Sequence, residues 1–238
     1  MPQLKTLKQW IEDSENIVFF GGAGVSTESG IPDFRSVDGL YSQKYEYSPE
    51  TIISRDFMEN KPEYFFRFYK EKMMPMGFSP NVTHIFLAKL EEKGKLNAVI
   101  TQNIDGLHQQ AGSRTVYELH GSIARNYCTT CRKKYSADYV KESIGIPRCS
   151  CGGMIRPDVV LYGERLDDDT FEAAAEAIEN ADMLIVGGTS LTVYPAAGLI
   201  RYYGGNRLVL INRDSTPYDS MADLVIHDSL GNVFSKII

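Results

Sequence analysis

The segment that decides the fold is residues 17–27, which read IVFFGGAGVST. The apolar run Ile17 to Phe20 is typical of a strand buried on both faces of a parallel sheet. The glycine-rich loop after it lets the backbone approach a pyrophosphate and point amide groups at it. The strict dinucleotide fingerprint needs glycine where Thr27 stands, and its acidic partner would fall near Asp38, inside a loop. The pattern predicts a nucleotide-binding loop and argues against an ordinary hydride-transfer dehydrogenase.

Strand and helix patterns alternate along most of the remaining chain. Similar apolar runs occupy residues 97–101, 116–119, 183–186, 208–211 and 224–226, and helical patterns occupy residues 4–14, 62–74, 81–93, 170–180, 195–203 and 231–238. This alternation predicts an α/β fold with a doubly wound, Rossmann-like parallel sheet. Its ligands should bind at the carboxyl ends of the strands.

Two stretches interrupt the alternation. Residues 39–79 are rich in aromatic side chains, and residues 123–154 contain every cysteine. We interpret them as insertions that form one smaller module, helical in the first stretch and metal-binding in the second. The expected organisation is a single domain, residues 1–238, whose large Rossmann-like part comprises residues 1–38, 80–122 and 155–238.

Composition limits the partners and the location. The 25 Lys and Arg against 31 Asp and Glu give a net charge of −6, which disfavours a nucleic-acid coating role. The longest apolar runs are far shorter than the ~20 residues of a membrane span. The first residues lack the apolar stretch of a secretory signal. We therefore expect a cytoplasmic monomer with no membrane partner and no specific nucleic-acid partner.

The cysteines have the spacing of a metal site. They form the close pairs Cys128-x2-Cys131 and Cys149-x-Cys151. Two such pairs can place four thiolates around a tetrahedral, structural Zn²⁺ with no position open for water. The alternative is two disulfides, which a reducing cytosol disfavours. We expect one structural zinc ion per chain.

Polar loops follow several of the predicted strands. They include residues 101–106, 119–122, 187–190 and 212–214. Any one of them may be read as a set of helix caps, since Asn, Asp, Ser and Thr favour that position. Because several meet at the same edge of the predicted sheet, we expect a functional site there.

These stretches together resemble the sirtuin family of NAD-dependent protein deacylases. The resemblance is carried, in chain order, by residues 22–35 (GAGVSTESGIPDFR), 101–108 (TQNIDGLH), 119–122 (LHGS), the cysteine quartet, 156–164 (RPDVVLYGE) and 188–191 (GTSL). It covers almost the whole chain, at a length close to that of a bare catalytic core of the bacterial type.

The resemblance implies a reaction and its catalytic residues. An acyl-lysine and NAD would give lysine, nicotinamide and 2'-O-acyl-ADP-ribose, an acyl transfer from protein to ADP-ribose. His120 would be the general base, because its ordinary pKa lies near working pH. A lone histidine at a strand end would otherwise be interpreted as structural. Asn103 and Asp105 would complete the catalytic set, while His84, His108 and His227 are expected to be structural or adjacent to the site.

The resemblance also assigns the binding residues. NAD would be held by Gly22, Ala23, Gly24, Thr27, Asp33, Phe34, Arg35, Gln102, Asn103, Ile104, Asp105, His120, Gly188, Thr189, Ser190, Asn212 and Asp214. The substrate peptide, carrying an acetylated lysine of a protein, would lie along Val159, Val160, Leu161, Tyr162, Gly163 and Val193. Backbone pairing of this kind accepts many sequences.

The acyl group and two other functions need separate consideration. Family members that remove succinyl groups carry a Tyr and an Arg where this chain has Phe66 and Tyr69, so we expect acidic acyl groups to be poor substrates. An ADP-ribosyltransferase is one alternative, in which a protein nucleophile captures the sugar. A non-enzymatic NAD-binding module whose zinc ribbon docks a partner is another.

Overall fold

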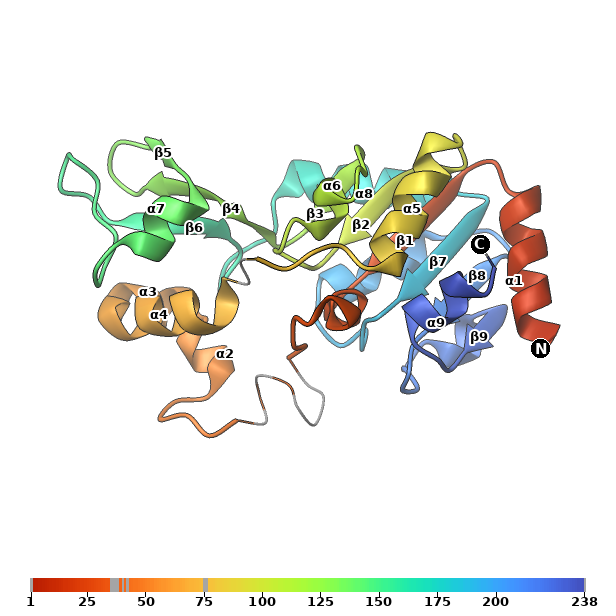
Figure 1. Ribbon diagram of the computed structural model, residues 1–238, viewed down its shortest axis with the longest axis horizontal. Coiled ribbons are helices and arrows are strands. Elements are labelled where there is room, and N and C mark those ends of the chain that lie inside the picture. The colour runs from red at the N-terminus through yellow and green to blue at the C-terminus, as the bar shows by residue number, and fades with distance from the viewer. Residues whose placement is uncertain (1, 35–38, 40, 42, 75–76, 238) are drawn as a thin grey trace.

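A six-stranded parallel sheet forms the centre of the larger part of the molecule (Figure 1). The computed structural model describes residues 2–34, 39, 41, 43–74 and 77–237. The strands lie in the order β3-β2-β1-β7-β8-β9 and all pair in parallel. Their bounds are β1 (Ile17–Gly21), β2 (Leu96–Thr101), β3 (Val116–Glu118), β7 (Met183–Gly187), β8 (Leu208–Ile211) and β9 (Leu224–Ile226). Because winding reverses between β1 and β7, their carboxyl ends form the switch point where such folds bind ligands.

Helices cover both faces of this sheet. One face carries α1 (Pro2–Asp13), α5 (Val82–Glu92) and α9 (Leu230–Ser235); the other carries α8 (Asp168–Glu179) and the 3-10 helix η5 (Ala196–Tyr202). Successive strand residues face opposite sides, so Phe19 packs with the first set and Phe20 with the second. Both rings are fully buried, and each contributes ~1.5–3 kcal/mol of transfer free energy.

A smaller module lies at the opposite end of the molecule from the termini (Figure 1). It contains the helices α2 (Pro49–Ile52), α3 (Arg55–Asn60), α4 (Pro62–Phe68), η4 (Tyr69–Met73) and α7 (Ala137–Glu142), with the antiparallel strands β5 (Lys134–Tyr135), β4 (Gly121–Cys128) and β6 (Ile155–Val159). One apolar cluster draws on both insertions. The predicted α/β fold with a helical and cysteine-bearing small module is confirmed.

Several elements differ from the sequence prediction. The strands β4 and β6 were not expected, because their sequences mix charged residues with a proline at 157 and their pairing shifts register between Ser122 and Asn126. The helix predicted over residues 62–74 changes to π-helical geometry at η4. The one predicted at 195–203 is a 3-10 helix. His108 lies in the short helix α6 (Leu107–Gln110), as expected, whereas the short elements that the patterns missed include η1 (Ala23–Val25), η2 (Thr27–Ser29), β5, α7 and η6 (Asp219–Met221).

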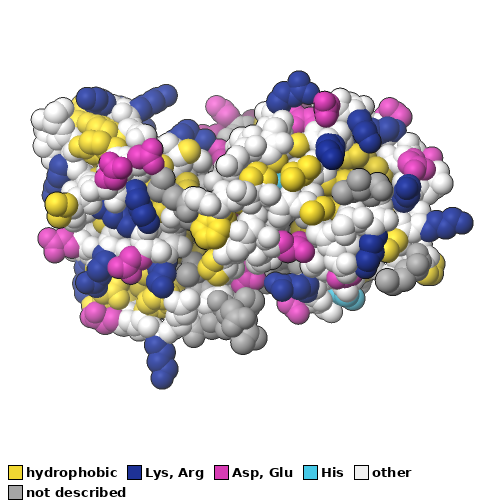
Figure 2. All heavy atoms as spheres, viewed as in Figure 1, with side chains coloured by type: hydrophobic (Ala, Val, Ile, Leu, Met, Phe, Trp, Pro, Cys, Tyr) yellow, Lys and Arg dark blue, Asp and Glu magenta, His cyan; other side chains and the backbone are white. Residues whose placement is uncertain are grey.

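The surface carries both signs of charge. Lys and Arg side chains are interspersed with Asp and Glu on the face shown in Figure 2, which offers no continuous basic stripe among the described residues. This agrees with the net charge of −6. No helix within the described residues has the length and apolar character needed to cross a membrane.

Two buried histidines lie side by side between α5 and α6. The rings of His84 and His108 are 4.7 Å apart at their centroids, and both residues are almost fully buried. His84 Nδ1 accepts a hydrogen bond from the Asn81 amide, whereas the described residues offer no partner to His84 Nε2 or to either ring nitrogen of His108. Burial lowers the pKa of His84 to about 4, and burial together with the charge of His84 lowers the pKa of His108 to about 3.

We expect acid to destabilise the protein through this pair. The folded-state pKa values lie below the ordinary 6.5, so the unfolded chain binds protons first as the pH falls. The stability is fully present above 6.5 and is lost between that pH and about 3. Urea unfolding as a function of pH should show a shallower decline in His108→Leu than in the wild type. Both proteins keep the same cysteine cluster, so metal loss cancels in the difference, and parallel curves would contradict the prediction.

Candidate active site

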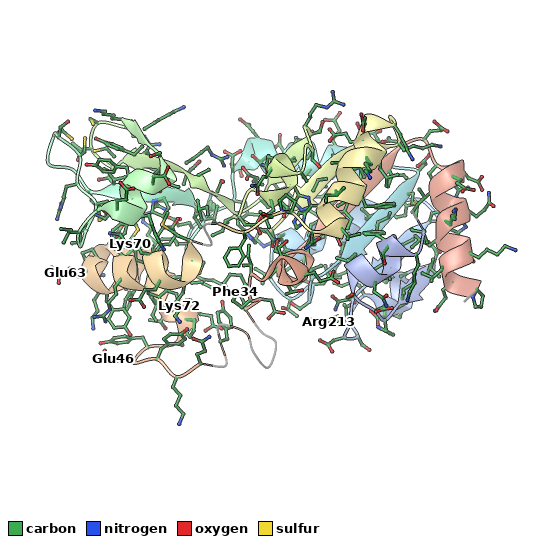
Figure 3. The ribbon with its side chains drawn as sticks, viewed as in Figure 1. Phe34, Glu46, Glu63, Lys70, Lys72 and Arg213 are labelled. Carbon is green, nitrogen blue, oxygen red and sulfur yellow. The ribbon has the colours of Figure 1, made fainter. Side chains whose placement is uncertain are left out.

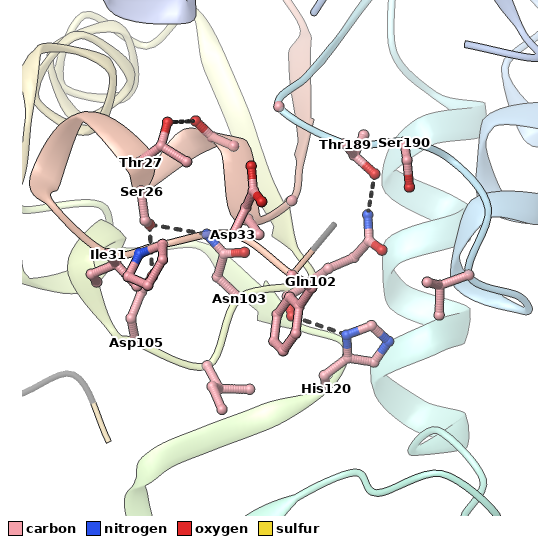
Figure 4. A pocket seen from close by; sticks show the side chains of 18 of the residues that line it. Ser26, Thr27, Ile31, Asp33, Gln102, Asn103, Asp105, His120, Thr189 and Ser190 are labelled. Carbon is pink, nitrogen blue, oxygen red and sulfur yellow. Dashed lines mark hydrogen bonds between the residues drawn. The ribbon is translucent and has the colours of Figure 1, made fainter. Parts of the chain in front are cut away.

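A cavity of about 440 Å³ opens at the carboxyl ends of β1, β2 and β7. Its walls come from the glycine-rich loop after β1, the loops after β2 and β7, and residues 159–164, which start at the last residue of β6 (Figure 4). Every residue that the sequence assigned to NAD or peptide binding lines this cavity except Arg35, which lies outside the described residues. The polar loops that were expected to meet at one edge of the sheet therefore do meet there.

Close backbone packing fixes the glycine-rich loop. The Gly24 amide donates to Gly188 O at 2.8 Å, and a Cβ at Gly24 would lie 2.7 Å from Gly188 Cα. Gly188 has a φ of 62°, which also favours glycine. A side chain at either position would force the two loops apart. Their backbones therefore form one wall of the cavity, over which a phosphate group can approach.

A hydroxyl group joins the two predicted catalytic side chains on the β2 loop. Ser26 Oγ donates to Asp105 Oδ2 at 2.7 Å, and Asn103 Nδ2 donates to Ser26 Oγ at 3.1 Å (Figure 4). Burial raises the pKa of Asp105, and the hydrogen bonds from the Leu107 amide and Ser26 oppose that shift. Ser26 was not singled out from the sequence, because a serine after a glycine loop gives no signal of a contact 79 residues away.

His120 directly precedes β4, and one of its ring nitrogens is held by a backbone hydrogen bond. Its Nδ1 is 2.9 Å from Gln102 O, and because a carbonyl only accepts, Nδ1 carries the proton. Nε2 is then the acceptor of the neutral ring. Burial lowers the pKa of His120, with the Gln102 carbonyl acting in the opposite direction. The ring is therefore neutral at neutral pH and able to take a proton. The Gln102 side chain donates to Thr189 Oγ1 at 3.0 Å, which links the loops after β2 and β7.

Further residues line the mouth of the cavity and were missed by sequence reasoning. Phe34 lies between the two parts of the molecule, with Lys72 on the side of the small module and Arg213 on the opposite side (Figure 3). Arg213 Nη2 is 3.7 Å from Asp33 Oδ2. These two cations carry no motif that would mark them in the sequence. Other lining residues outside the predicted binding set include Ile31, Pro32, Tyr41, Ile53, Met73, Glu164, Leu166, Pro195, Ile211 and Ser215.

The four cysteines gather in the small module as predicted. Their Sγ atoms all lie within 4.8 Å of one another. The closest pairs are 3.5 Å apart, far longer than the ~2.05 Å of a disulfide. The amides of Thr130 and Cys131 point at Cys128 Sγ, and Tyr135 Oη donates to Cys149 Sγ at 3.0 Å. Four thiols with such donors fit a structural zinc ion.

Loss of one thiol should release the metal. We expect Cys128→Ala or Cys149→Ala to reduce bound zinc from one per chain to near zero and to unfold the small module, because structural zinc contributes folding free energy directly. Metal analysis and proteolysis measure the two effects. Ser150→Ala, which changes the residue between two of the ligands, is the control and should keep its zinc. Full zinc content in either cysteine variant would count against the site.

The geometry first defines a class of protein. A doubly wound sheet, a glycine-rich loop packed at its switch point and a neutral histidine whose Nε2 has no hydrogen-bond partner among the described residues are features of a nucleotide-dependent enzyme. The comparisons with known proteins narrow this class. The model of the Sir2 family matches residues 22–195.

The relatives agree over the whole chain. An NAD-dependent protein deacetylase of Clostridium perfringens is 58% identical, covering 99% of this chain and 98% of that protein. One of Clostridium acetobutylicum is 57% identical, covering 100% and 99%. A solved Sir2 structure with a p53 peptide and NAD⁺ is 43% identical with a TM-score of 0.87, covering 98% of this chain and 96% of that one. A Sir2 structure with deacetylated p53 peptide and 3'-O-acetyl ADP ribose has 42% identity, a TM-score of 0.91 and coverage of 99% and 97%. The chain belongs to the Sir2 family, the sirtuins.

Proposed function

We propose that this chain is an NAD-dependent protein-lysine deacetylase. It converts an acetyl-lysine, NAD and one water molecule into lysine, nicotinamide and 2'-O-acetyl-ADP-ribose. The observation that carries this proposal is His120, whose acceptor nitrogen belongs to a cavity lined by both the glycine-rich loop and residues 159–163. Deacetylases more than half identical over the full chain support it.

The cavity residues fit NAD as the cosubstrate. The backbone of residues 22–24 and Thr27, with Arg35, would hold the diphosphate; residues 188–190, Asn212 and Asp214 would hold the adenosine end. NAD, when bound, supplies an activated sugar carbon that loses nicotinamide. Phe34 would shield this carbon from water. Asp33, Gln102 and Ile104 would complete the binding surface.

The catalytic residues act on protons and orientation. Asn103 and Asp105, held through Ser26, would position the ribose and the carboxamide of the cosubstrate. His120, neutral and protonated on Nδ1, would accept a proton at Nε2 from a ribose hydroxyl. The Gln102 carbonyl fixes the ring orientation during this transfer.

The substrate peptide would bind along residues 159–163, which we call the substrate segment, with Val193 on the facing side. Both line the cavity that contains His120. A peptide pairing with this backbone would direct its acyl-lysine toward the histidine. The proposed substrates are acetylated lysines of proteins.

The remaining organisation is part of the same proposal. Residues 1–238 form a single catalytic domain with a large part (1–38, 80–122 and 155–238) and a small module (39–79 and 123–154) that binds one structural zinc ion. The apolar cluster that combines both insertions supports a joint small module, and it also takes in Ile155, Val159 and Leu161 from the start of the last large segment. A cytoplasmic monomer is proposed, and a cluster of four reduced thiols fits a reducing compartment.

Replacement of the base should abolish turnover and spare binding. We expect His120→Ala to lower kcat by about 10²–10⁴-fold, the usual contribution of a general base, while NAD affinity stays near that of the wild type. Kinetics with an acetyl-lysine peptide and calorimetric NAD titration measure the two quantities. His227→Ala, at an exposed position outside the cavity lining, is the control. Undiminished turnover in His120→Ala would overturn the assignment.

The acyl group should be neutral. Phe66 and Tyr69 are buried in the core of the small module and add no positive charge to the cavity. We expect kcat/KM for a succinyl-lysine peptide to be at least about tenfold below that for the acetyl peptide, since an unpaired charge is costly to desolvate. Lys72 does line the cavity. Efficient desuccinylation that disappears in Lys72→Gln would contradict the prediction and identify Lys72 as the partner of the acid.

A further inference from the structure

An ion pair joins two residues that flank the substrate segment in the sequence. Arg156 is in β6, before the segment, and Glu164 follows it. Arg156 Nη1 is 2.6 Å from Glu164 Oε1 and Nη2 is 3.0 Å from Oε2, so the guanidinium and the carboxylate meet through two parallel bonds. The side chains are only 12% and 15% exposed. This shielding from solvent distinguishes the pair from the surface ion pairs of the chain, which contribute little to the free energy of unfolding.

The same two side chains hold the backbone of the segment. Arg156 Nη2 donates to Val159 O at 3.0 Å, and Glu164 Oε2 accepts from the Leu161 amide at 2.9 Å. The Glu164 amide in turn donates to Leu161 O at 3.0 Å, which closes a turn. Charge-assisted hydrogen bonds to the backbone of Val159 and of Leu161 therefore fix the course of the chain between these two residues.

Some of the remaining backbone groups of the segment form hydrogen bonds with neighbouring parts of the chain, and others do not. The Val160 amide donates to His120 O at 3.0 Å, and Tyr162 pairs through its amide with Ile53 O at 3.1 Å. Within the described part of the chain, Val160 O and the Gly163 amide make no hydrogen bond. A backbone carbonyl and a backbone amide are thus left for a bound peptide, on a segment also tied to the residue proposed as the base.

The ionisation state of Glu164 favours a stable ion pair with Arg156. Burial alone would raise its pKa, but the hydrogen bonds from Arg156 and the Leu161 amide and the charge of Arg156 bring the pKa below its usual value. The carboxylate is therefore charged at neutral pH. Removing either partner would leave a shielded charge unpaired and release a backbone group of the segment.

We propose that Arg156 and Glu164 are positioning residues that hold the substrate segment in the shape that binds the acyl-lysine peptide. The inference rests on the proposed function of residues 159–163 as the peptide-binding backbone. All of the side-chain hydrogen bonds of the pair lie within residues 156–164, and none of them reaches the glycine-rich loop. Loss of the pair therefore weakens peptide binding and leaves NAD binding unchanged.

The test compares peptide and NAD binding in matched variants. Glu164→Gln keeps the shape of the side chain and removes its charge. Arg156→Lys keeps the charge and removes the two parallel hydrogen bonds that the guanidinium makes. The dissociation constant of a fluorescent acetyl-lysine peptide is measured by anisotropy, that of NAD by calorimetry without peptide, and KM and kcat by steady-state kinetics. We expect each variant to raise the peptide Kd and KM about tenfold, as for hydrogen bonds to charged groups, with the NAD Kd unchanged. The double variant should be no weaker than the weaker single one, because both remove the same interaction.

A second ion pair on the same strands supplies the control. Arg125 in β4 bonds to Asp158 in β6 at 2.9 Å and to Glu118 at 2.6 Å, but its side chain is 53% exposed. Arg125→Gln should bind peptide as the wild type does. Thermal unfolding and zinc content are recorded for every variant, so that a folding defect in one is recognised and the other single variant decides.

Two results would overturn the inference. One is an unchanged peptide Kd in both single variants, and the other is a parallel loss of NAD affinity, which would mark the pair as general support of the fold. A wild type that binds the peptide but does not deacetylate it would contradict the proposed function instead, while the peptide-binding comparison would still decide the role of Arg156 and Glu164.

Discussion

The contact between Gly24 and Gly188 is the constraint on which the site depends. It allows the loops after β1 and β7 to touch through their backbones at the switch point of the sheet. Ser26 follows directly and reaches Asp105 and Asn103 on the loop after β2. Gln102, on that same loop, bonds to Thr189 and accepts from the His120 ring. One close backbone approach thus sets the positions of four loops that carry chemistry.

The two parts of the molecule contribute different surfaces to one cavity. The large part supplies the nucleotide-binding loops, and the strands β4 and β6 lead from its edge into the small module. His120 precedes β4, and the substrate segment begins at Val159, the last residue of β6, so this antiparallel pair places the proposed base beside the proposed peptide-binding backbone. The zinc-binding cysteines at the far end of β4 stabilise the same ribbon, which explains how a structural metal can support a site that it does not touch.

Sequence alone predicted the central sheet well, because strands such as 183–186 are continuous apolar runs that only a buried parallel sheet accommodates. The cysteine spacing predicted the metal cluster, and the ordered motifs predicted many of the residues that line the cavity. The strands β4 and β6 escaped prediction because both are polar and their register shifts. Ser26, Lys72 and the Arg156–Glu164 pair escaped it because their roles arise from contacts formed by the folded chain. A charged residue, unlike an apolar periodicity, gives no signal in the sequence of the group that it will contact in the folded protein.

The central claim is that the cavity transfers an acetyl group from lysine to the ADP-ribose of NAD. The most direct measurement incubates the protein with an acetyl-lysine peptide, with and without NAD, and follows the products by mass spectrometry. The account predicts nicotinamide, deacetylated peptide and O-acetyl-ADP-ribose in equal amounts, and only when NAD is present. Nicotinamide release with ADP-ribose attached to protein, or no consumption of NAD by a folded and zinc-loaded sample, would contradict it.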